Sequence, residues 1–168
     1  MKKLWIVVLM TVLAFFSGCP KSNPQSGNAA LREECVYSPL RAHIVGLTSV
    51  KSDPAGGSKA IISAYVSLHD RFDSNMKAPG VFRFELYEYV MNSRSSEKRG
   101  KRLYVWPDLD LNDAVANNSY WKDYLRAYNF VLDPKIDLSV PKPYILQVTF
   151  LTPGKRLGDL FPLKGGNR

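Results

Sequence analysis

The side chains that could act as a nucleophile, a base or a metal ligand are few in this chain of 168 residues. It contains two histidines, His43 and His69, and two cysteines, Cys19 and Cys35. Neither Gly-x-Ser-x-Gly nor His-Glu-x-x-His occurs, and the chain has no glycine-rich phosphate loop. A catalytic Cys–His pair depends on proximity in the fold, which these positions do not indicate. We therefore expect a protein that is not an enzyme, with no catalytic residue and no cofactor.

Closely spaced aspartates are the clearest candidates for metal ligands. Asp108, Asp110 and Asn112 place oxygen atoms at alternate positions, as the first ligands of an EF-hand calcium loop do. Such a loop needs glycine at its sixth position and glutamate at its twelfth, where Asp113 and Ser119 stand. The spacing therefore excludes an EF-hand.

A looser calcium cup, with carboxylates from two neighbouring loops, would be similar in kind to the calcium sites of C2 domains. Its members would be Asp70, Asp73, Asp108, Asp110 and Asp113. The alternative is that these side chains close turns and cap a short helix, because Asp accepts hydrogen bonds from nearby backbone N–H groups. We favour the second interpretation and predict no metal site.

Aromatic side chains offer a candidate binding surface. Sugar-binding sandwiches present exposed rings to the apolar side of a pyranose ring. The rings available for this are Tyr87, Tyr89, Tyr104, Trp106, Tyr120, Trp121 and Tyr124, of which Trp106, Trp121, Tyr87 and Tyr89 are the candidates. The alternative is that these rings form the core and its cover.

A basic cluster lies between two of these aromatic groups in the chain. It consists of Arg94, Lys98, Arg99, Lys101 and Arg102, with Glu97 as the one opposing charge. A solvated hairpin turn is one interpretation, and a contact with an acidic partner or with anionic headgroups is the other. Arg99 and Arg102 are the candidate binding residues of this cluster.

The first nineteen residues have the features of an export signal that ends in a lipidated cysteine. Lys2 and Lys3 precede a thirteen-residue apolar run, Leu4 to Phe16, which is too short for a span of roughly 20 residues. The motif Phe16-Ser17-Gly18-Cys19 resembles the lipobox of bacterial lipoproteins, although Phe16 replaces the usual leucine. The resemblance implies cleavage after Gly18, acylation of Cys19 and attachment to the lipid bilayer. An ordinary secretory signal, with Cys19 incidental, is the alternative.

The rest of the chain divides into a tether and one domain. Residues 19–34 are rich in Pro, Ser, Asn and Gly, which predicts a lipidated flexible tether after the signal peptide 1–18. Residues 35–163 predict one domain and residues 164–168 a disordered tail. The formal charge of +8 falls to about +6 without Lys2 and Lys3. An exported domain of this charge meets anionic lipids and cell-wall polymers, so no nucleic-acid partner is expected. With Cys19 acylated, Cys35 has no partner for an intramolecular disulfide.

Alternating apolar residues predict seven short strands and no helix of three turns. The predicted strands are 41–50, 60–68, 81–91, 101–106, 125–132, 144–151 and 157–163, and segment 108–123 is predicted to be a long loop with one helical turn. The pattern favours an all-β, antiparallel β-sandwich that is Ig-like in the broad sense. The two cysteines flanking a tryptophan that mark true Ig domains are absent.

These observations favour a bacterial envelope lipoprotein whose sandwich binds another envelope protein. The layout of lipobox, short linker and sandwich is similar to that of the small outer-membrane lipoprotein of type VI secretion systems and of several pilot-type lipoproteins. Binding of carbohydrate or a cell-wall polymer through the aromatic side chains is the alternative. We favour the outer membrane or periplasmic face for the anchor. Pro20 follows Cys19 in place of the aspartate best known for inner-membrane retention, and this residue does not decide between the leaflets.

Overall fold

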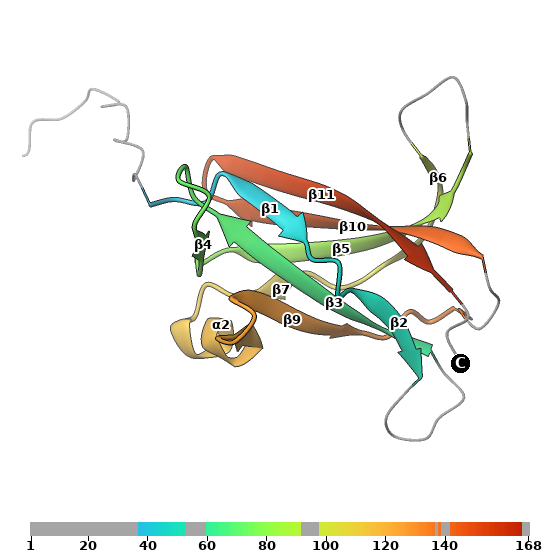
Figure 1. Ribbon diagram of the computed structural model, residues 1–168, viewed down its shortest axis with the longest axis horizontal. Coiled ribbons are helices and arrows are strands. Elements are labelled where there is room, and N and C mark those ends of the chain that lie inside the picture. Colours follow the sequence, from blue (N-terminus) through green and yellow to red (C-terminus); the bar gives the residue numbers. More distant parts are fainter. Residues whose placement is uncertain (1–36, 53–59, 92–97, 137, 139–141, 166–168) are drawn as a thin grey trace, which may run out of the picture. The chain divides into compact units, whose positions relative to one another are not determined.

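Two antiparallel sheets pack face to face in the computed structural model (Figure 1). The structure describes residues 37–52, 60–91, 98–136, 138 and 142–165, which belong to one structural unit, Glu34–Arg168. The predicted signal peptide, Cys19, the predicted tether and Cys35 lie outside the described residues.

The first sheet is built on β3 (Ala60–His69), which has partners on both edges. β1 (Arg41–Ile44) and β2 (Ser49–Ser52) pair with its C-terminal and N-terminal halves. β9 (Ala127–Leu132) pairs with its centre, and β4 (Asn75–Met76) pairs with its C-terminal end. β8 (Trp121–Lys122) extends the sheet beyond β9.

The second sheet has the strand order β11-β10-β5-β6. β10 (Pro143–Thr152) and β11 (Lys155–Lys164) pair over their whole lengths. β5 (Val81–Tyr89) joins β10 to β6 (Arg99–Val105), and β7 (Leu109–Asp110) pairs with the start of β5. The helix α2 (Ala114–Tyr120) follows β7. It begins after Asp113, because the Asp113 carboxylate caps its first turn by accepting the Ala116 N–H at 2.8 Å.

The core is formed by the inward-facing residues of both sheets. Phenyl rings meet at its centre, where the Phe82 ring centroid lies 4.6 Å from that of Phe150 and 5.0 Å from that of Phe130. Full burial of one such ring stabilises the fold by roughly 1.5–3 kcal/mol. The buried faces of β3, β5, β9 and β10 are those that the alternation of apolar residues in the sequence indicates.

One carboxylate joins the two sheets where their edge strands run side by side. Asp159 of β11 accepts the backbone N–H of Ile44 in β1 at 2.7 Å, and its Oδ2 also lies 3.0 Å from His43 Nδ1. Figure 1 shows β1 (cyan) along β11 (red). This bond satisfies a backbone donor on an edge that no strand of the described part covers by pairing.

The all-β sandwich predicted from the sequence is confirmed, but its elements differ from the prediction; β4, for example, matches no predicted strand. The predicted strand 41–50 is two strands, because a turn closed by the Thr48 N–H and the Val45 carbonyl interrupts it. The predicted loop 108–123 contains β7, α2 and β8, and its helix has seven residues. The predicted tail begins too early, because Lys164 pairs with Pro143 at the end of β11.

Candidate functional site

The five aspartates proposed for a calcium cup each serve a separate local role. Asp70 closes its own turn by accepting the N–H groups of Phe72 and Ser74, and Asp113 caps α2. Asp110 accepts from the backbone and side chain of Asn112. Within the described ranges, no group of three or more His, Cys, Asp or Glu side chains is placed to hold a metal ion.

Asp108 and Asp73 form ion pairs with arginines. Asp108 receives two hydrogen bonds from Arg83, at 2.8 and 2.7 Å, and this partner lowers the pKa of its carboxyl below the ordinary value. Asp73 pairs with Arg41. Turn closing or capping is therefore seen for Asp70, Asp110 and Asp113, whereas Asp73 and Asp108 form ion pairs instead.

The two candidate tryptophans are part of the core. Trp106 is 7% exposed and Trp121 is 9% exposed. The Trp106 indole N–H donates to the Asp133 carbonyl at 3.0 Å, and the Trp121 ring meets Tyr128 edge-on. Neither ring offers a free face for a sugar, so placing these two residues in a binding surface was wrong.

The other four candidate binding residues come together on the outer face of β5 and β6. Tyr87 lies opposite Arg102, and Tyr89 lies opposite Arg99. The Arg99 guanidinium stands over the Tyr87 ring, 5.4 Å from its centroid. We call Tyr87, Tyr89, Arg99 and Arg102 the tyrosine–arginine face.

Two polar partners fix the arginines of this face. Arg99 donates to the Gln147 side-chain oxygen on β10. Arg102 donates to Glu85 at 3.0 Å, and this hydrogen bond raises the pKa of Arg102 above its ordinary value. The Glu85 side chain is only 9% exposed, whereas that of Arg102 is 59% exposed. The buried carboxylate thus holds a guanidinium that still presents most of its surface to solvent.

The position of β6 makes this face accessible to another molecule. β6 ends the strand order of its sheet, and within the described residues it pairs with β5 alone. Lys101 on this strand is exposed. Basic side chains on an edge strand discourage nonspecific strand pairing, and they leave a positive surface for an acidic partner.

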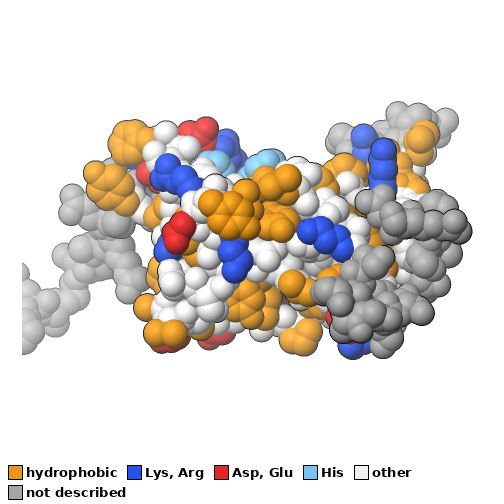
Figure 2. All heavy atoms as spheres, turned by 60° about the horizontal axis from the view of Figure 1, so that its bottom comes forward, with side chains coloured by type: hydrophobic (Ala, Val, Ile, Leu, Met, Phe, Trp, Pro, Cys, Tyr) orange, Lys and Arg blue, Asp and Glu red, His pale blue; other side chains and the backbone are white. Residues whose placement is uncertain are grey.

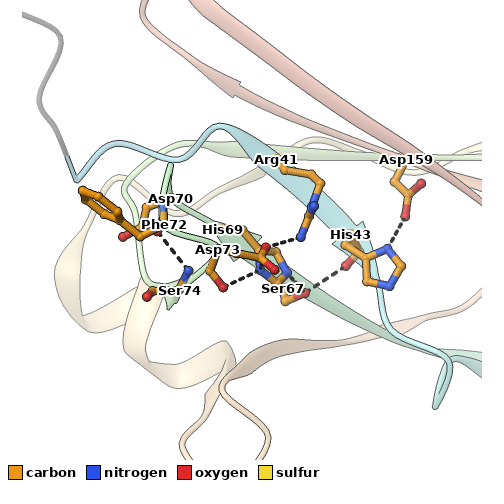
Figure 3. Close-up of polar contacts among 9 residues, drawn as sticks. All are labelled: Arg41, His43, Ser67, His69, Asp70, Phe72, Asp73, Ser74 and Asp159. Carbon is orange, nitrogen blue, oxygen red and sulfur yellow. Dashed lines mark hydrogen bonds and ion pairs between the residues drawn. The ribbon is translucent and has the colours of Figure 1, made fainter.

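A second polar cluster lies on the outer face of the first sheet (Figure 3). Ser67 Oγ lies 2.9 Å from His69 Nε2, and His69 Nδ1 lies 3.2 Å from Asp73 Oδ1. Ser67 and His69 share a face because they are two residues apart on β3. Asp73 reaches them from the following turn, where its φ is 63°.

The contacts follow the order of a Ser-His-Asp triad. No sequence motif indicated this cluster. The serine is unsuited to nucleophilic attack, because Ser67 is 3% exposed and lies within β3, where it pairs with His43 of β1. Catalytic serines of this kind instead project from a sharp turn beside oxyanion-binding N–H groups. The cluster's evident role is to fasten the turn after β3 to β1 through Arg41 and Asp73.

Comparison with protein-family models, with curated proteins and with solved structures finds no match to this chain. No helix within the described ranges could cross a membrane. A function for this protein is therefore inferred from the surfaces described above and from the N-terminal motif.

Proposed function

We propose that this protein is a bacterial envelope lipoprotein, anchored to the membrane through acylated Cys19, whose β-sandwich is a non-enzymatic protein-interaction module. The anchor is supported by the basic residues, the apolar run and the lipobox-like Phe16-Ser17-Gly18-Cys19. Two or more acyl chains hold a protein stably on a bilayer, at about 0.8 kcal/mol for each buried methylene. The domain would then work at the membrane surface, with the outer membrane or its periplasmic face favoured.

The tyrosine–arginine face is the observation that carries the interaction role. Tyrosine and arginine are enriched among the residues that dominate protein interfaces. Arg99 and Arg102 are already held by Gln147 and Glu85, so binding would order them at little further entropic cost. The face would suit an acidic surface of another envelope protein.

Carbohydrate binding, the alternative function, has less support in this arrangement. With Trp106 and Trp121 in the core, Tyr87 and Tyr89 are the remaining candidates, and both are half-buried. Arg99 covers the first ring, and Lys98 Nζ lies 5.9 Å from the centroid of the second. Neither ring is free to stack on a pyranose without displacing its cation.

The anchor is tested by Cys19→Ser in a bacterial host. We expect the substitution to abolish labelling by a fatty-acid analogue and to release the protein from membranes. Unchanged membrane association in the variant would contradict the anchor.

The interaction is tested by charge reversal on the tyrosine–arginine face. Arg99→Glu with Arg102→Glu should reduce chemical crosslinking to envelope proteins in intact cells, and the loss should be greater at low salt because exposed charges are screened beyond about 8 Å at physiological ionic strength. Lys51→Glu with Lys122→Glu changes the net charge equally on the first sheet and is the matched control.

A further variant separates binding from folding. Arg102→Gln keeps a hydrogen-bond donor for Glu85 while removing the charge, so it should weaken capture to an intermediate degree. Its thermal unfolding is measured beside capture, because the buried Glu85 carboxylate loses its cation. Equal capture by the native protein and both arginine variants would rule out this face as the binding surface.

A further inference from the structure

The exposed aromatic rings of the described residues all lie at one end of the sandwich. They are Tyr37, Phe72 and Tyr124, with 68%, 65% and 81% of their surfaces exposed. Leu40 and Val115 are also exposed at this end. We call these five residues the aromatic end. Figure 2 shows hydrophobic side chains beside charged ones at the left of the molecule, and others over the rest of the visible face.

Hydrogen bonds bring segments far apart in the chain to this end. The Leu40 N–H donates to the His69 carbonyl at 2.8 Å, which sets the first described residues beside the turn that carries Phe72. Asn75 donates to the Arg126 carbonyl at 3.1 Å, which sets β4 beside the turn that carries Tyr124. Figure 1 shows β4 and α2 at the same end as the start of β1.

The exposure of Phe72 is built into its turn. The Asp70 carboxylate accepts the N–H groups of Phe72 and Ser74, at 2.8 and 2.9 Å, and Asp73 pairs with Arg41. Figure 3 shows the Phe72 ring pointing away from the polar cluster, beside the start of the described chain. A ring held outward in a hydrogen-bonded turn loses little conformational freedom when it binds a surface.

We propose that the aromatic end makes a reversible contact with the membrane–water interface, so that the sandwich favours one orientation against its own bilayer. This inference rests on the proposed lipid anchor. The described chain begins at Tyr37, within the aromatic end, and eighteen peptide units separate this residue from Cys19. Fully extended, they reach about 60 Å at most. The tether therefore joins the domain at this end and is long enough for the end to reach the lipid.

The chemistry of the aromatic end suits the interface of a bilayer. Tyrosine rings are apolar along one side and polar at the hydroxyl, and such rings concentrate at the level of the lipid headgroups. Charges of both signs surround them, with cations in excess: Arg41, Arg71, Lys77, Lys122, Arg126 and Lys155, whose Nζ lies 3.0 Å from Ser38 Oγ, stand against Asp70, Asp73, Asp113 and Asp123. The contact should consequently form through the rings on a neutral bilayer, and anionic lipid should strengthen it at low salt.

A weak contact is sufficient because the anchor makes it intramolecular. A short linker gives an effective concentration of about millimolar, so a surface contact with a Kd of about millimolar is formed roughly half of the time. The same contact would be too weak to recruit an unanchored domain from solution.

The test uses the full-length acylated protein, reconstituted into phosphatidylcholine vesicles that contain no other protein. Cys35 is first replaced by serine. Each of two variants then carries one new cysteine for a fluorescent label, Arg71→Cys beside Phe72 or Met91→Cys. Met91 follows the end of β5 that leads to β6, away from β4 and α2 (Figure 1). Vesicle flotation establishes anchoring, and quenching by aqueous iodide measures the exposure of each label.

We expect the label at position 71 to be quenched about twofold less than the label at position 91, as a contact formed half of the time requires. Serine at Tyr37, Phe72 and Tyr124 should remove this protection while flotation is unchanged. Serine at three exposed apolar residues outside the aromatic end is the matched control and should leave the protection intact; these are Leu47, Val131 and Leu160.

The outcomes separate this inference from the anchor on which it rests. A chain that floats with the vesicles but shows equal quenching at both positions would overturn the membrane contact alone. A chain that does not float would overturn both the anchor and the contact.

Discussion

The buried amide of Asn117 links α2 to the sandwich, and its removal should be costly. Asn117 donates to the carbonyls of Ala78 and Leu111, both at 2.9 Å, and its Oδ1 accepts the Tyr128 hydroxyl at 2.9 Å. Tyr128 is fully buried, and this burial raises the pKa of its hydroxyl. Asn117→Ala would leave three buried polar groups without these partners.

The expected loss follows from the number of these bonds. Each hydrogen bond contributes a net stability of about 1 kcal/mol, and an orphaned buried group adds a further penalty, so Asn117→Ala should lower the free energy of unfolding by about 3 kcal/mol. Asn118→Ala is the matched control, because the neighbouring Asn118 is exposed and its side chain accepts a hydrogen bond from the exposed Lys77. Its cost should stay below about 0.5 kcal/mol.

Urea denaturation of the chain with Cys19→Ser, followed by tryptophan fluorescence, measures both variants. Equal midpoints for Asn117→Ala and Asn118→Ala would refute the buried network as a source of stability. A changed denaturant slope in one variant would indicate a different unfolded or native state, and the midpoints alone could not then be compared.

Three further expectations concern the core, the aspartates and pH. Trp121→Ala should lower the free energy of unfolding by about 3–5 kcal/mol, as loss of a core aromatic does, and a cost below 1 kcal/mol would contradict its burial. Millimolar calcium should leave the thermal midpoint of the native protein and of Asp110→Ala unchanged, whereas a shift of many degrees lost in the variant would establish a calcium site. Because Arg83 lowers the pKa of Asp108 in the folded state, Asp108→Asn should cost stability near pH 7, and the difference should vanish as the pH falls through the folded-state pKa. A difference that persisted at pH 2 in urea titrations would exclude this ion pair as its cause.

The strand faces could be predicted from the sequence because a strand has a period of two. Phe82, Phe84 and Leu86 are all fully buried, as their alternation with polar residues indicates. An aromatic residue outside such an alternating run cannot be assigned to a face in this way. Trp106 and Trp121 lie at the ends of elements, where no alternation shows which way a ring points. Trp106 reaches the Asp133 carbonyl after β9, and Trp121 packs on Tyr128 of β9.

The candidate surfaces depend on turns and registers that local patterns do not encode. Tyr87 meets Arg102 because the pairing of β5 with β6 shifts at two points, and a shift of one residue moves a side chain to the other face. The cluster of Ser67, His69 and Asp73 needs a turn with a positive φ at its aspartate. The spacing of Ser67 and His69 on a predicted strand was the one signal of that cluster in the sequence.

Site-specific photocrosslinking in intact cells would test whether this domain is an anchored interaction module. A photoreactive residue at Tyr87, on the tyrosine–arginine face, is compared with one at Val131, on the outer face of the first sheet. We predict that the probe at position 87 captures one or a few envelope proteins that the probe at position 131 does not. We also predict that Arg99→Glu removes those products while the chain stays in the membrane fraction. Identical products from both positions, unaffected by Arg99→Glu, would contradict the proposed function.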